Sequence, residues 1–134
     1  MLSCDEHGIV TGFSYHDGFL DGVLVSDDGT AARFAVRSIE GVRRILTLRG
    51  VVSLHLDGFR QGNIVGYMWL LRGDQASANL EVRRLLIEEL GRPALPEATL
   101  AFVIDTSYGA NVIAICATAE ISEPGVTLDA ASSY

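Results

Sequence analysis

Apolar and polar residues alternate along residues 46–57. The apolar positions are Leu46, Leu48, Val52, Leu54 and Leu56. The polar positions are Thr47, Arg49, Ser53, His55 and Asp57. Because successive side chains of a strand point to opposite faces, this pattern predicts an antiparallel strand, or two strands broken at Gly50, with the polar row in solvent. A second alternation over 30–38 puts Ala32, Phe34 and Val36 on one face and predicts another half-buried strand.

Further strands are indicated by segments rich in β-branched and aromatic residues at 8–14, 19–26 and 63–71. Two late segments, 99–105 and 111–121, are apolar at nearly every position. Such segments are covered on both faces, either by the rest of the chain or by another subunit. The second alternative gives the hypothesis of a homodimer formed through residues 99–121, with assembly itself as the function.

One helix is predicted near residues 77–90. Its apolar stripe consists of Val82, Leu85, Leu86 and Leu90. Ser77 or Asp74 is suited to cap its start, and Gly91 is suited to end it. The expected fold is therefore α+β: about eight mostly antiparallel strands, arranged as a sandwich or barrel, with this helix packed on the sheet. Residues 1–121 form the expected single globular domain, and residues 122–134 the expected flexible C-terminal tail.

Charge narrows the choice of partners. The chain of 134 residues has a formal net charge of −7, which argues against nucleic acid and favours a basic protein partner. Its ten basic residues are all arginine, so Schiff-base chemistry and a P-loop lysine are excluded. No apolar stretch is long enough to cross a membrane and no export signal is present, which predicts a cytoplasmic protein without membrane contact.

The motif D-G-F-x-x-G-x-x-V occurs twice, at 17–25 and 57–65. A histidine lies close to each copy, so His16, Asp17, His55 and Asp57 are candidate ligands for a metal ion or a small molecule. However, His16 and Asp17 are adjacent and point to opposite faces of an extended segment, whereas His55 and Asp57 share a face. The favoured interpretation is a turn signal used twice, with the ligand site kept as the alternative.

A polar loop at 105–111 joins the two apolar strands. Asp105, Ser107, Tyr108 and Asn111 are candidate partner-binding residues, because polar groups held by rigid strands commonly bind ligands. A tight turn at Gly109 is the simpler alternative. Five arginines on predicted strands suit either carboxylate or phosphate recognition or a solvated face paired with acids: Arg33, Arg37, Arg43, Arg44 and Arg49.

No spacing joins three titratable residues into a catalytic set, so we expect neither an enzyme nor a bound cofactor. The segments "YHDGFLDGVLV", "LRGVVSLHLDGFRQGNIV" and "FVIDTSYGANVIAIC" resemble small bacterial proteins of unknown function, some of which are assigned as immunity proteins of polymorphic toxin systems. The resemblance covers about half of the chain and implies no catalytic residue. The leading hypothesis is a small acidic bacterial protein that binds a protein without catalysis, in one form an immunity protein. The ligand-binding protein and the structural homo-oligomer are its alternatives.

Overall fold

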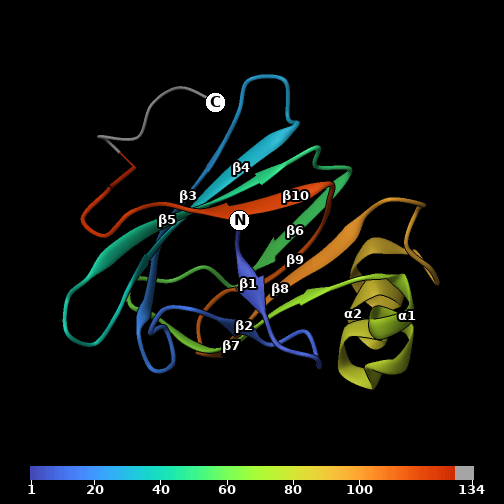
Figure 1. The fold of residues 1–134 in the computed structure, drawn as a ribbon, viewed down its shortest axis with the longest axis horizontal. Helices are drawn as coiled ribbons and strands as arrows, with labels where there is room; N and C mark the ends of the chain where they lie inside the picture. Colours follow the sequence, from blue (N-terminus) through green and yellow to red (C-terminus); the bar gives the residue numbers. More distant parts are fainter. Residues whose placement is uncertain (129–134) are drawn as a thin grey trace.

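A computed structural model describes residues 1–128 of the chain (Figure 1). The strands are β1 (Ser3–Cys4), β2 (Val10–Thr11), β3 (Phe19–Val25), β4 (Ala31–Arg37), β5 (Arg43–Arg49), β6 (Ser53–Asp57), β7 (Asn63–Leu71), β8 (Leu100–Tyr108), β9 (Asn111–Cys116) and β10 (Thr118–Ile121). The helices are α1 (Gly73–Ala78) and α2 (Leu80–Leu90). Strands β1 and β2 form a separate two-stranded sheet. Of the first strand predicted at 8–14, only Val10–Thr11 is a strand in the structure.

Eight strands form one antiparallel sheet in the order β10-β5-β4-β3-β7-β8-β9-β6. The α+β class is thus confirmed, but the sheet is open and does not close into a barrel. Its two halves face each other across the main core, where the rings of Phe34 on β4 and Phe102 on β8 lie 5.7 Å apart. Only Ala117 separates β9 from β10, so one bent segment contributes a strand to each half.

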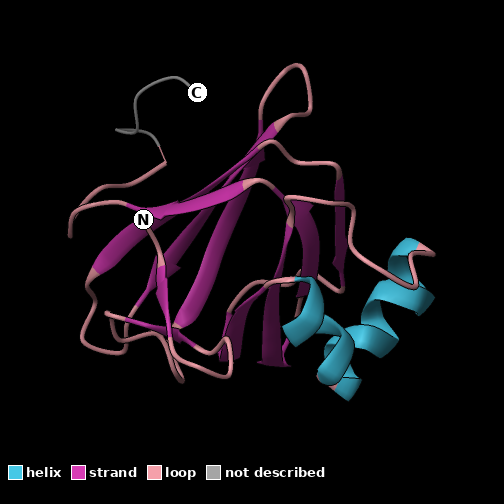
Figure 2. Cartoon of the chain, turned by 45° about the vertical axis from the view of Figure 1, so that its right-hand side comes forward, coloured by secondary structure: helices cyan, strands magenta, loops and turns pink. Residues whose placement is uncertain are grey.

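Both helices pack on the outer face of the half formed by β7, β8, β9 and β6, as Figure 2 shows. The prediction of one helix at 77–90 is wrong at its start. The chain turns into α1 directly after β7, breaks at the extended residue Asn79 and begins α2 there. The Asn79 side chain accepts a hydrogen bond from the backbone N–H of Val82, so it takes the capping role expected of Ser77 or Asp74. Gly91 ends α2 in the left-handed conformation, as predicted.

The alternation over 46–57 belongs to two strands, and they do not lie side by side. Gly50 has φ +62 and sits against Ala117, where a side chain would clash. From this corner β5 pairs with β4 and β10, whereas β6 pairs with β9 at the far edge of the sheet. The shared parity does not give shared burial: Leu46 and Leu48 are buried in the core, but Val52 and Leu56 are exposed.

The apolar strands near the C-terminus are covered on both faces within the chain itself. On β8 and β9, Phe102 and Ala114 face the main core, while Val103 and Ile113 lie beneath the helices in a second cluster. The apolarity that suggested a dimer through 99–121 is therefore accounted for by central strands of one molecule.

The predicted flexible tail begins at Ser122, yet residues 122–128 lie against the sheet, first along β5 and then over Gly22 of β3. The N–H of Ser122 donates to the carbonyl of Ile45 (2.9 Å), and the N–H of Gly125 donates to the carbonyl of Arg43 (2.7 Å). We call this segment the C-terminal strap. The rest of the predicted tail, 129–134, lies outside the described residues.

Candidate binding face

Several of the predicted site residues lie on the outer face of the sheet, beside the helices. Trp69, Val103 and Ile113 contact the helices from this face. On each strand, the residue two positions away, toward the end that the helices do not cover, shares this face. These residues are Tyr67 on β7, Asp105 on β8 and Asn111 on β9. The strand pairings place these residues side by side across the sheet, because Tyr67 pairs with Asp105 and Asn111 pairs with Asp57 on β6. We call His16, Tyr67, Asp105, Asn111 and Asp57 the outer row.

Aromatic rings form one end of the outer row. The ring centroids of His16 and Tyr67 are 5.4 Å apart, and those of Tyr67 and Trp69 are 6.0 Å apart in a stacked arrangement. His16 Nδ1 lies 2.6 Å from the carbonyl oxygen of Gly66, to which it donates, so that Nε2 faces away from the sheet. Tyr67 is half exposed. A ring pair held this way offers flat faces to a ligand.

Asp105 lies beside the first turns of α2. Burial raises the pKa of its carboxyl, the nearby Glu81 raises it further, and Arg84 acts in the opposite direction. Arg84 is engaged elsewhere: its guanidinium is 2.6 Å from carboxylate oxygens of both Glu81 and Glu88. Asp105 is therefore a partly desolvated carboxylate beside other acids, and it makes no ion pair within residues 1–128.

The metal-site alternative depends on His16, Asp17, His55 and Asp57. His16 lies near Asp17, with 3.7 Å between Nε2 and Oδ1, while His55 Nε2 lies 2.9 Å from an oxygen of Glu89 on α2. Asp57 pairs with Asn111 at the open end of the face. Residues 1–128 contain no group of three or more His, Cys, Asp or Glu side chains placed to hold a metal ion. His55 is also half buried under α2, so the prediction that the whole polar row of residues 46–57 lies in solvent is wrong at this position.

The predicted polar loop at 105–111 is mostly strand: β8 runs to Tyr108 and β9 begins at Asn111, so only Gly109 and Ala110 form the hairpin turn. Asn111 Oδ1 accepts the N–H of Thr106 (3.1 Å), and the ring of Tyr108 lies 5.7 Å from the guanidinium of Arg60. Gly109 has φ +99, and a side chain there would meet Asn63. Asp105 and Asn111 thus belong to the outer row, whereas Tyr108 is directed to Arg60.

The two D-G-F copies fold differently. In the first, Asp17 takes a positive φ, Phe19 begins β3 and a bulge follows at Gly22. In the second, Gly58 takes the positive φ and Phe59 is exposed in a loop before β7. Each copy therefore forms a turn, but only Phe19 enters a strand, whereas Phe59 stays exposed in the loop.

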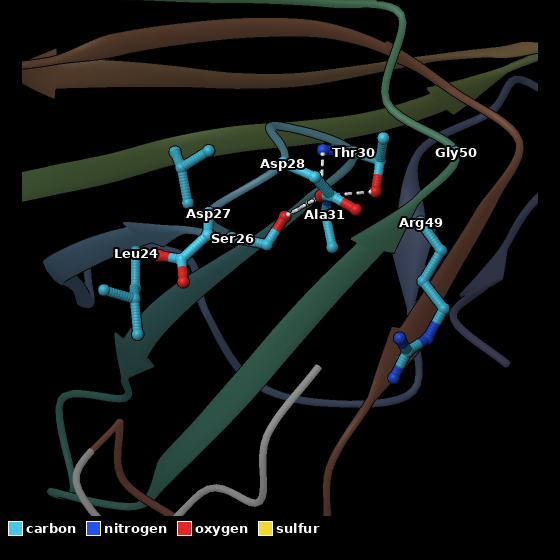
Figure 3. A pocket seen from close by; sticks show the side chains of 9 residues that line it. Leu24, Ser26, Asp27, Asp28, Thr30, Ala31, Arg49 and Gly50 are labelled. Carbon is cyan, nitrogen blue, oxygen red and sulfur yellow. Dashed lines mark hydrogen bonds between the residues drawn. The ribbon is translucent and has the colours of Figure 1, made fainter.

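A hollow of about 670 Å³ lies at the β3–β4 hairpin (Figure 3). Three of its polar residues are already bonded to one another: Asp28 Oδ1 accepts from the hydroxyls of Ser26 (2.8 Å) and Thr30 (2.7 Å) and from the N–H of Thr30 (2.9 Å). These bonds, first that of the Thr30 backbone, lower the pKa of Asp28. They stabilise the turn and leave few groups for a ligand.

Comparisons with known proteins show a similar fold and nothing further. No protein-family model matches the sequence. No curated protein matches it either. A solved structure described as an uncharacterized protein from Neisseria gonorrhoeae superposes with a TM-score of 0.52 at 12% sequence identity, over 81% of this chain and 93% of that one. In addition, no helix among residues 1–128 is long and apolar enough to cross a membrane.

Sequence reasoning found part of this face. It named His16, Asp57, Asp105 and Asn111 for two different sites, and the structure brings them onto one face. Neither Tyr67 nor Asn63 was among its candidate site residues. The signal for Tyr67 is its parity with Trp69 on β7, because the pairing with β8 is regular from Tyr67 to Trp69 and both side chains share one face.

Proposed function

We propose that this chain is a non-catalytic binding module that takes a basic protein segment on the outer row. The observation that carries the proposal is the placement of Asp105 at the centre of an exposed row that ends in aromatic rings. Asp105 is a partly buried carboxylate next to Glu81, and it has no ion-pair partner among residues 1–128. A carboxylate in this position costs stability in the free protein. A ligand cation offsets that cost.

The chemistry of the row fits a guanidinium or ammonium group. A cation beside Asp105 gains a charge-assisted hydrogen bond, and its neighbour can lie over the face of Tyr67 or Trp69. The net charge of −7 attracts a basic partner from a distance. An immunity protein that covers a basic toxin surface is one form of this function, and only the sequence resemblance suggests that form.

A synthetic hexa-arginine peptide tests the proposal by calorimetry and by NMR titration of backbone amides. We expect saturable binding that weakens with added salt, with shifts centred on β7 and β8. Asp105→Asn and Tyr67→Ala should each weaken binding about tenfold, the effect of losing one charge-assisted or cation–π contact.

The matched control is Glu40→Gln, which removes the same charge from an exposed turn between β4 and β5. It should leave the affinity nearly unchanged. If Glu40→Gln and Asp105→Asn weakened binding equally, the affinity would depend only on the net charge of the protein, and the outer row would not be the binding site. Absence of saturable binding would reject the proposal as well.

A further inference from the structure

The other half of the sheet carries the opposite charge on its outer face. On β4, Arg37 and the buried Arg33 alternate with residues that face the core, and on β5 the residues Arg43 and Arg49 do the same. Arg37 and Arg43 are direct partners in the β4–β5 ladder. Like charges placed opposite each other in a sheet are unfavourable unless an anion lies between them.

Only one of these two guanidiniums is neutralised. Arg37 donates to Asp21 through Nε (2.9 Å) and Nη2 (3.2 Å), a two-pronged bond that raises the pKa of the arginine further. Arg43 is exposed, and no carboxylate of residues 1–128 forms an ion pair with it.

The C-terminal strap turns this part of the face into a hollow. Ser122 and Gly125 fix it to β5: the N–H of Ile45 donates to Ser122 Oγ (2.8 Å), and Arg44 Nη1 donates to the Ser122 carbonyl (3.0 Å). Further along, Leu128 lies over Gly22, where any side chain would crowd it. The strap appears at the left of Figure 1, next to β5.

The hollow between strap and sheet has a volume of about 450 Å³. Its charged lining includes Asp21, Arg37 and Arg43, and its strap side consists of Val126, Thr127 and Leu128. One wall thus supplies guanidinium donors, and the other supplies apolar surface and a hydroxyl. This combination suits a ligand with an anionic end and an apolar body.

We propose that this hollow binds a small organic oxyanion, a phosphate ester or a carboxylate, with Arg43 as its main donor. The exposed fork of Arg43 can take two oxygens of the anion, and the Arg37–Asp21 ion pair forms the neighbouring wall on the opposite strand. Such a site is distinct from the outer row, because it lies on the other half of the sheet and has the opposite sign.

Phenyl phosphate and benzoate are the probes, titrated separately into the full chain and followed by calorimetry and by NMR of the backbone amides and arginine Nε–H groups. We expect saturable shifts at Arg43, Gly125 and Thr127. Arg43→Gln should weaken binding about tenfold, as expected for loss of one charge-assisted contact. Tighter binding of phenyl phosphate identifies a phosphate-ester site, and tighter binding of benzoate identifies a carboxylate site.

Two further variants make the result decisive. Arg92→Gln removes an equal charge from the segment after α2, far from the hollow in sequence and outside its lining, and should leave binding unchanged. Asp21→Asn removes the competing carboxylate and releases the Arg37 fork, so it should tighten binding severalfold, an effect that general destabilisation cannot imitate. Failure of both probes to saturate, or an equal loss in Arg43→Gln and Arg92→Gln, would overturn the proposal.

Discussion

The side-chain amide of Asn63 is fully buried and bonds only to backbone. Its Nδ2 donates to the carbonyls of Leu20 (3.1 Å) and Arg60 (2.6 Å), and its Oδ1 accepts from the N–H groups of Arg60 (2.8 Å) and Ala110 (2.9 Å). One residue therefore joins β3, the loop before β7 and the β8–β9 turn. It holds in place the hairpin that presents Asp105 and Asn111.

We expect Asn63→Ala to lower the free energy of unfolding by about 2–4 kcal/mol, because it leaves several buried backbone groups unpaired. Urea unfolding followed by circular dichroism measures the change. Gln61→Ala, an exposed substitution in the same loop, is the control and should cost less than about 0.5 kcal/mol. Similar losses in the two variants would show that the buried amide does not stabilise the fold.

Asp105 is a residue whose charge opposes stability. Because burial and Glu81 raise its pKa in the folded protein, folding is disfavoured while the carboxylate is ionised. This cost is fully present above the raised pKa, shrinks as pH falls through it, and is gone below the ordinary value for aspartate. A binding residue that carries such a cost agrees with the function proposed for the outer row.

Asp105→Asn should therefore raise the melting temperature at neutral pH, with a gain in free energy below about 1 kcal/mol since solvent screens this partly exposed group. The gain should fade as the pH is lowered through the acidic range. Thermal unfolding of both proteins across a pH series measures it. A gain that is constant with pH, or a loss at neutral pH, would contradict the raised pKa.

At the scale of elements, patterns with a local cause were predictable. The strand β4, the end of α2 at Gly91 and the break at Gly50 follow from alternation and from the freedom of glycine at positive φ. The division between α1 and α2 was missed, because neither glycine nor proline separates them. Asparagine serves there both as the end of one helix and as the cap of the next.

Asn79→Ala should lower the free energy of unfolding by about 1 kcal/mol, the usual effect of losing an N-cap side chain. Asn79→Ser keeps a capping oxygen and should recover most of that loss. Chemical denaturation of the three proteins measures the difference. If serine and alanine were equally destabilising, the Asn79 side chain would not act as the cap.

At the scale of the whole molecule, the fold depends on contact between the two halves of the open sheet. Phe34 and Phe102 are both fully buried and belong to strands that are not neighbours in the sheet. Their ring contact therefore reports directly on the closeness of the halves. The second cluster, between sheet and helices, lies on the other side of β8.

A double-mutant cycle tests this arrangement. Phe34→Leu and Phe102→Leu should each cost about 1–3 kcal/mol, and the double variant should depart from additivity by about 0.5–1.5 kcal/mol because the rings touch. Phe34→Leu combined with Val82→Ala in the second cluster should be additive within about 0.5 kcal/mol. Additivity in the phenylalanine pair would mean that the two halves do not pack as described.

The sequence by itself determined most of the strands, the helix that ends at Gly91, and which segments are apolar on both faces. These properties follow from the period of two in a strand and 3.6 in a helix, and they need no knowledge of neighbours. Only the tertiary structure decided that β5 and β6 separate at Gly50, that His55 lies under α2, and that candidates assigned to two different sites share the outer row. Strand order and the position of a helix are set by packing between residues far apart in the chain, and alternation along one segment carries no information about them.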